Sequence, residues 1–189
     1  IRQYMEMYGS GLSGVIVMGT GAQPRVALFF GKLLCKVIAA FKGDDYRSAF
    51  VDNMAFGGYN KRFEPARTDK DWLTRDEKEV DAYLANPWCT FRFTVNAYYH
   101  MFCGIEYAQK KENIEKIPKD LPLYLVAGSD DPVGNFGKSV KNVAKSYREC
   151  GIKDVSLKLY EKDRHEILNE LDRQTVYEDI LAWVEAHLI

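Results

Sequence analysis

The hydrophobic pattern near the start of the chain predicts a helix followed by a buried β-strand. Residues 1–9 (IRQYMEMYG) have the pattern of the later part of an amphipathic helix that ends at Gly9. The next block, LSGVIVMGTG (12–21), contains an apolar run that is typical of a buried strand and leads into a glycine-rich loop. Because Ile1 is not an initiator methionine and the helix looks incomplete, we expect this chain to be a fragment of a longer protein.

A matching block lies near the other end of the chain. LPLYLVAG (121–128) predicts a second buried strand, and a helix follows over about 138–149 with Gly151 as its stop. The segment DVSLKLY (154–160) predicts a third strand, whose inward residues are Val155, Leu157 and Leu159 and whose outward residues are Ser156 and Lys158. A last helix is expected over about 174–187, with an apolar stripe formed by Val176, Ile180, Leu181 and Val184. Alternating strands and helices of this length predict an α/β fold with a parallel sheet covered on both faces.

Residues 23–119 break this alternation, and they read as an insertion between consecutive strands of the sheet. The region is rich in lysine, aspartate and aromatic residues, and its pattern predicts helices and no strands. The stretch 86–107 contains many aromatic side chains that could line an apolar pocket or form the region's own core: Trp88, Phe91, Phe93, Tyr98, Tyr99, Phe102 and Tyr107. In 26–41 (VALFFGKLLCKVIAAF), Lys32 and Lys36 share one face of a predicted helix whose other face could rest at a site mouth or touch a lipid surface. The charged run 67–81 is expected to be a solvated face.

Composition narrows the function classes. The chain has 189 residues, of which 47% are hydrophobic and 28% charged, as in a soluble globular protein. Its formal net charge of −1 provides no basic field for nucleic acid or an anionic membrane, and the most apolar stretch is too short and too charged to span a bilayer. The four cysteines have no metal-ligand spacing, so we expect no metal, no cofactor and a reducing, cytoplasmic setting.

Candidate chemistry lies at the ends of the two late strands. VAGSDDPVG (126–134) follows one strand and carries Asp130 and Asp131, and YEKDRHE (160–166) follows the next and carries His165. Parallel strands joined by one helix end at the same edge of a sheet, so a carboxylate and this imidazole should meet there. A carboxylate would fix the tautomer of His165, which could then act as a general base. The alternatives are that His165 is an ordinary surface residue of a loop and that Asp-Asp-Pro forms only a turn.

A nucleotide-binding module is a second interpretation of the same region. The sequence GNFGKS (134–139) has the ending of a phosphate-binding loop, but the first glycine of G-x-x-x-x-G-K-[ST] would fall on Pro132, which has no backbone N–H to donate. His100 and His187 lack a comparable setting, and we expect both to be structural.

Five segments in order resemble the α/β-hydrolases of the serine aminopeptidase and monoglyceride-lipase-like (lysophospholipase-type) group. The segments are GVIVMGTG, FEPARTDKDWLTRDEKEVDAYLANPWCTFRFT, LPLYLVAGSDDPVG, LYEKDRHEILNE and VYEDILAWV. The resemblance implies an α/β-hydrolase core in residues 1–22 and 120–189 with a largely helical cap in 23–119. It also implies that Asp131 is the acid and His165 the base of a Ser-His-Asp triad, and that Asp130 has no such role.

The nucleophile of such a triad is missing from the chain. The family places it in G-x-S-x-G, which Ser10, Ser13 and Ser129 all fail to match, so its strand and turn are expected upstream of Ile1. The resemblance implies a hydrolase of small esters or lipid-like molecules, of the carboxylesterase or lysophospholipase/monoacylglycerol lipase type. The alternatives are a serine aminopeptidase and a hydrolase-fold protein that binds ligands without turning them over. The sequence indicates nothing about oligomeric state.

Overall fold

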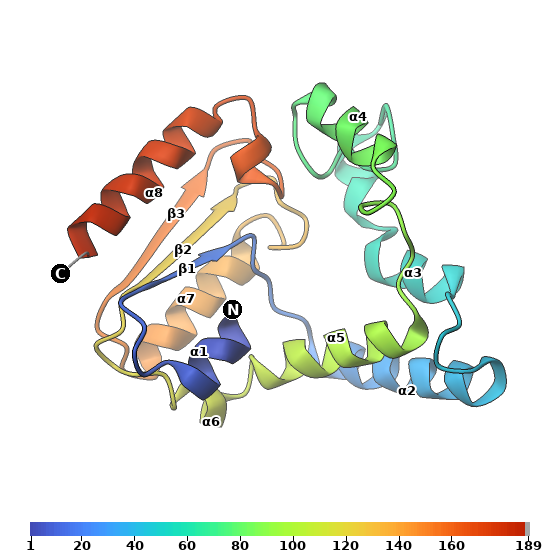
Figure 1. The fold of residues 1–189 in the computed structure, drawn as a ribbon, viewed down its shortest axis with the longest axis horizontal. Helices are drawn as coiled ribbons and strands as arrows, with labels where there is room; N and C mark the ends of the chain where they lie inside the picture. Colours follow the sequence, from blue (N-terminus) through green and yellow to red (C-terminus); the bar gives the residue numbers. More distant parts are fainter. Residues whose placement is uncertain (188–189) are drawn as a thin grey trace.

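The computed structural model describes residues 1–187, in which a three-stranded parallel sheet carries helices on both faces (Figure 1). In chain order the helices and strands are α1 (Arg2–Tyr8), β1 (Val15–Met18), α2 (Arg25–Lys42), α3 (Ala49–Phe56), η1 (Tyr59–Phe63), α4 (Glu77–Ala85), α5 (Val95–Tyr107), α6 (Lys111–Ile114), β2 (Leu123–Gly128), α7 (Lys138–Glu149), β3 (Val155–Tyr160), η2 (Ile167–Asn169) and α8 (Arg173–His187). The predicted strands and the predicted helix over 138–149 are confirmed.

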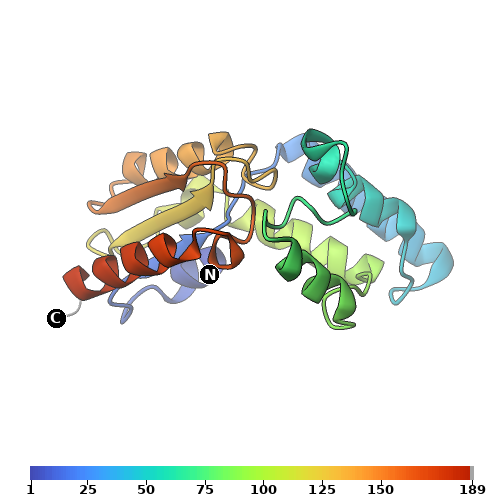
Figure 2. The ribbon, with the colours of Figure 1, turned by 90° about the horizontal axis from the view of Figure 1, so that it is seen from above.

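The sheet has the order β1-β2-β3, so β2 lies in the centre. Leu123 of β2 is opposite Val15 on one side and Val155 on the other, and every residue of β2 is buried. On one face the strands pack against α1, α6 and α7, and on the other against α8, so that the strands lie between α7 and α8 in Figure 2. A central strand covered on both faces explains the continuous apolar run of LYLVAG.

The outer strand and the last helix differ in detail from the predicted pattern. Lys158, which was expected to point outward, lies beneath α8 and pairs with Asp179. Leu181 was expected in the buried stripe of α8 but is 56% exposed. Trp183 packs in its place, with its ring stacked on Tyr124 at 5.5 Å between centroids. The buried stripe of α8 therefore keeps Val176 and Ile180 but includes Trp183 in place of Leu181.

The middle region, residues 23–119, is helical throughout the part that forms regular structure, as predicted. It extends from the end of the sheet at which the strands stop, with α2 and α5 side by side along one edge (Figure 1). The side chains of Ser48, Asp76 and Thr94 cap the starts of α3, α4 and α5 by accepting backbone hydrogen bonds. Among the described residues, no helix has both the length and the apolar character needed to cross a membrane.

The two lysines of α2 have partners within the protein. Lys32 forms an ion pair with Glu106 of α5 at 2.6 Å, and the ammonium of Lys36 lies 5.1 Å from the ring centroid of Tyr99. Both lysines therefore contact α5, as do the buried apolar residues Leu28 and Cys35 of the same helix. Other apolar side chains of α2, among them Phe30, Leu33 and Val37, are exposed.

Candidate active site

Asp131 lies in a tight loop that connects the end of β2 to α7. Its side chain is fully buried, and its Oδ1 accepts a hydrogen bond from the backbone N–H of Val133 at 2.8 Å. The loop returns on itself because Asn135 and Phe136 adopt positive φ angles of 48° and 54°, and the N–H of Phe136 donates to the backbone oxygen of Asp131 at 2.8 Å. These bonds fix the carboxylate and leave its Oδ2 for a further partner.

That partner is His165, in the loop between β3 and α8. The imidazole Nδ1 lies 3.1 Å from Oδ2 of Asp131, so the two loops meet as the sequence predicted. The carboxylate can accept a hydrogen bond from Nδ1–H, and in that tautomer Nε2 is the basic nitrogen. The His165 side chain is 28% exposed, and within residues 1–187 its Nε2 has no hydrogen-bond partner. This geometry can orient an imidazole and stabilise its protonated form.

Asp130 has a different position from Asp131. Its backbone N–H donates to the backbone oxygen of Asp163 at 2.9 Å, which joins the β2–α7 loop to the β3–α8 loop. The other two histidines lie away from this site. His187 is hydrogen-bonded to the backbone oxygen of Trp183 and to Asp154 at 3.1 Å, and these bonds raise its pKa. His100 is an exposed residue of α5.

Two glycines allow the close approach of backbone around His165. Gly19, at the end of β1, has a φ of +57°, and a Cβ there would lie 3.0 Å from Cε1 of His165. A Cβ on Gly128, at the end of β2, would lie 2.0 Å from the backbone oxygen of Asp163 and 2.2 Å from that of Arg164. The glycines therefore let two strand ends reach the loop that carries the histidine.

The imidazole forms part of the wall of a large, mostly apolar cavity. Its volume is about 1270 Å³, and it lies between the ends of the strands and the middle region. The lining includes Met18, Gly19 and Trp72, and the largest apolar contribution comes from α2, α3 and α5 through Leu28, Phe30, Leu34, Met54, Phe102 and Ile105. An apolar enclosure of this size can hold a sizeable hydrophobic group next to the histidine.

For the aromatic stretch 86–107, the sequence left open a pocket lining and a core of the middle region, and the structure shows both. Of the seven aromatic residues considered from the sequence, Phe102 is in the lining. Tyr98 is instead buried in the core of the middle region, where its hydroxyl bonds to Asp52 at 2.5 Å, and Trp88 is 83% exposed. The apolar face of α2 supplies much of the wall, as the placement of that helix at a site mouth had suggested.

The prediction that 67–81 is a solvated face is wrong for its central part. Trp72, Leu73 and Thr74 are buried, and the ring of Trp72 lies 5.3 Å from that of His165. The backbone oxygens of Trp72 and Leu73 accept hydrogen bonds from the N–H groups of His165 (3.4 Å) and Glu166 (2.7 Å). In the sequence, the adjacent apolar residues Trp72 and Leu73 between charged residues were the indication that this part of the segment is buried.

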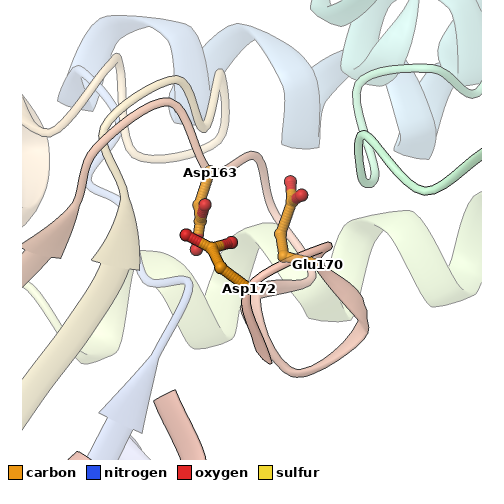
Figure 3. Close-up of side chains that lie close together, drawn as sticks. All are labelled: Asp163, Glu170 and Asp172. Atoms are coloured by element: carbon orange, nitrogen blue, oxygen red, sulfur yellow. The ribbon is translucent and has the colours of Figure 1, made fainter. Parts of the chain in front are cut away.

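A group of carboxylates lies beside the same loop. Asp163 and Glu170 are fully buried, and together with Asp172 they form the cluster in Figure 3. One carboxylate oxygen from each of the three residues lies within 4.8 Å of the other two. Such a set could hold a metal ion, but here the guanidinium of Arg75 contacts all of them, at 2.5 Å, 2.8 Å and 2.6 Å. Burial, with the charge of Glu170 and a hydrogen bond to Asp172, raises the pKa of Asp163 to about 7. The cluster already contains its own cation, so these residues do not fit a metal site.

Solved structures resemble the whole of this chain. A carboxyl esterase from Bacillus coagulans, solved in complex with glycerol, superimposes with a TM-score of 0.90 and 28% identity over 100% of this chain and 61% of its own length. A lipase in its open form superimposes with a TM-score of 0.84 and 25% identity, over 98% of this chain and 61% of its own length. A soluble variant of monoglyceride lipase from Saccharomyces cerevisiae, solved with a substrate analogue, superimposes with a TM-score of 0.67 and 17% identity, over 99% of this chain and 61% of its own length. This chain thus spans less than two thirds of the length of these relatives.

A comparison with protein families agrees with these structural matches. The family model described as "Serine aminopeptidase, S33" matches residues 1–172, which is most of the chain. No curated protein matches the chain in sequence. With the parallel sheet, the helical cover on both faces and the structural likeness to an esterase and lipases, the family match confirms the predicted fold: the chain belongs to the serine aminopeptidase S33 family and has a partial α/β-hydrolase fold.

Proposed function

We propose that Asp131 and His165 are the acid and the base of a serine hydrolase that cleaves esters of apolar acyl groups, of the carboxylesterase or lysophospholipase/monoacylglycerol lipase type. The observation that carries this proposal is the 3.1 Å contact between Nδ1 of His165 and Oδ2 of Asp131 at the wall of the apolar cavity. A serine oxygen would attack the ester carbonyl while Nε2 of His165 takes its proton. The same nitrogen would return the proton to the leaving alcohol, and water activated in the same way would release the acid.

The nucleophile in this proposal is a serine that precedes Ile1. The β1 strand supports this because, within residues 1–187, it pairs with β2 along one edge and has no partner along the other. Beside that edge, a groove against α8 is lined by apolar side chains, including Ile16, Met18 and Leu181. An upstream strand could pair with β1 and cover this groove. Residues 1–22 and 120–189 would then complete an α/β-hydrolase core, and 23–119 would be its cap.

The family's name raises the alternative of an aminopeptidase. Such an enzyme must bind the ammonium group of a peptide N-terminus, for which a carboxylate is the natural partner. Among the described residues that line the cavity, Arg2 and His165 can be cations, and there is no aspartate or glutamate. This lining favours an uncharged acyl group over a peptide terminus. A binding protein without activity would share the lining and would differ in the residue at the nucleophile position.

The test uses the complete gene product, including any residues that precede Ile1. Its hydrolysis of p-nitrophenyl esters with acyl chains of two to twelve carbons is compared with that of aminoacyl p-nitroanilides. We expect ester hydrolysis, and a loss of about 10²–10⁴-fold in kcat/KM in His165→Ala, the range found for a general base. His100→Ala is the matched control, because His100 is exposed on α5 and should change nothing. Faster cleavage of the anilides, or full ester hydrolysis by His165→Ala, would contradict the proposal.

A further inference from the structure

The loop that carries His165 has little regular structure of its own. Between the end of β3 at Tyr160 and the start of α8 at Arg173, it contains the single short turn η2. Contacts with other parts of the chain must therefore determine where the imidazole lies. Asp163 lies two residues before His165 and Glu170 five residues after it, and Figure 3 shows their side chains close together. Both carboxylates are fully buried.

Arg75, from the proposed cap, joins these two acids. Its Nη2 lies 2.5 Å from Oδ1 of Asp163, and its Nε lies 2.8 Å from Oε2 of Glu170. Its Nη2 also contacts the partly exposed Asp172 at 2.6 Å. One guanidinium thus binds a carboxylate on each side of His165 in the turn. A planar group with several donors can make these contacts at the same time.

Glu170 also binds the backbone next to His165. Its Oε1 accepts hydrogen bonds from the backbone N–H of Arg164 at 2.8 Å and from that of Arg75 at 3.2 Å. Arg164 directly precedes His165. The carboxylate that pairs with Arg75 therefore binds the backbone of the residue next to His165.

The rest of the segment 71–76, which we call the strap, runs along the same turn. Its backbone oxygens accept the N–H groups of His165 and Glu166, as described above, and the hydroxyl of Thr74 donates to the backbone oxygen of Asn169 at 2.9 Å. The guanidinium of Arg164 donates in return to the backbone oxygen of Thr74 at 3.2 Å. The turn that carries the base is thus held from outside, by the cap, along its whole length.

We propose that Arg75 is a positioning residue, which keeps His165 against Asp131 by bridging Asp163 and Glu170 from the cap. This inference rests on the proposed function, since it assigns a role in placing the base. It implies that the cap does more than cover the cavity: the base lies in its productive place only while the strap is docked. Loss of the bridge removes the cation beside the buried carboxylate of Glu170 and a hydrogen-bonding partner of Asp163, which favours movement of the turn toward water.

The test compares Arg75→Gln and Arg75→Lys with Arg67→Gln in the complete gene product. Arg67 is a matched control because it is also a cap arginine that contacts carboxylates, Asp81 at 2.7 Å and Glu77 at 3.9 Å, and both lie in α4, away from the His165 turn. Two readouts are taken from each folded variant. One is kcat and KM for a short p-nitrophenyl ester, and the other is the downfield proton resonance of the His165 Nδ1–H, assigned by its loss in His165→Ala.

We expect Arg75→Gln to lower kcat at least tenfold with KM within about threefold, and to shift or broaden the Nδ1–H resonance. Arg75→Lys should fall between Arg75→Gln and the wild type, since an ammonium cannot bridge the set of carboxylates as a guanidinium does. Arg67→Gln should match the wild type. If Arg75→Gln does not fold, Arg75→Lys decides alone, and a wild-type kcat and resonance in that variant overturn the inference.

The resonance separates this inference from the proposed function. A wild-type protein that shows the resonance but hydrolyses no ester contradicts the proposed function, and the change in resonance in Arg75→Gln still tests the role of Arg75. An unchanged resonance and kcat in folded Arg75→Gln overturn the inference and leave the proposed function standing. Absence of the resonance from the wild type contradicts both.

Discussion

Replacement of Asp163 by asparagine should change how the stability of the protein depends on pH. The fully buried Asp163 carboxyl faces the guanidinium of Arg75 and the carboxylates of Glu170 and Asp172. Burial, and then the two neighbouring acids, raise its pKa from 3.8 to about 7, although Arg75 opposes the shift. Asparagine has a similar shape and no proton to lose, so it resembles the protonated acid.

The sign of the effect follows from proton binding. Between pH 3.8 and about 7, the native state holds a proton on Asp163 that the unfolded chain has released, so the stabilising contribution is complete below that range and is lost as pH rises through it. Each pH unit in the window is worth about 1.4 kcal/mol, which sets a ceiling of about 4 kcal/mol. Because Asp172 is half exposed and shares the charge with solvent, we expect about 1–2 kcal/mol.

The assay is urea unfolding of the complete gene product at pH 5 and pH 8. The free energy of unfolding of Asp163→Asn, taken relative to the wild type, should rise by about 1–2 kcal/mol between the two pH values. Glu6, whose pKa burial also raises to about 7, is present in both proteins and cancels. Asp120→Asn is the control, because Asp120 is exposed and pairs with Lys153, and its relative stability should stay constant. A constant or falling value for Asp163→Asn would show that Arg75 keeps this carboxyl ionised, and would refute the reasoning.

Two further substitutions test the packing around the site. Gly128→Ala should destabilise the protein by about 3 kcal/mol or more, because its Cβ would meet the backbone oxygens of Asp163 and Arg164. Thermal melting measures this, with Gly58→Ala as the control because a Cβ there meets nothing within 4 Å. Equal melting temperatures for the two variants would contradict the geometry. Leu34→Trp should fill part of the apolar cavity and lower kcat/KM for a dodecanoyl ester at least tenfold while an acetyl ester changes less than threefold. An equal change for both esters would place the acyl group elsewhere.

The elements that the sequence predicts well are those with a strong local pattern. The helix of Lys138–Glu149 was predicted with its observed bounds, since its apolar spacing is regular and Gly151, with a φ of 87°, ends it. The buried run of β2 was equally clear. The meeting of Asp131 and His165 was also predictable, because the carboxyl ends of neighbouring parallel strands share one edge of the sheet.

The errors come from contacts between distant parts of the chain. Arg75 looked like a solvated charge because nothing in its own neighbourhood in the sequence shows that its partners are Asp163 and Glu170. Leu181 and Trp183 both fit a helical stripe, and which of them is buried depends on how α8 crosses the sheet. Local pattern and the shared edge of parallel strands therefore predicted that Asp131 and His165 meet, but not that the strap contacts the turn around His165.

The most direct test of the account is the site at which a fluorophosphonate reagent reacts with the complete gene product. The account predicts a single labelled serine, located by peptide mapping in a G-x-S-x-G sequence that precedes Ile1. It also predicts that labelling slows at least 100-fold in Asp131→Asn and in His165→Ala, because the pair at 3.1 Å activates that serine. A labelled serine within residues 1–189, or an unchanged labelling rate in both variants, would contradict the central claim.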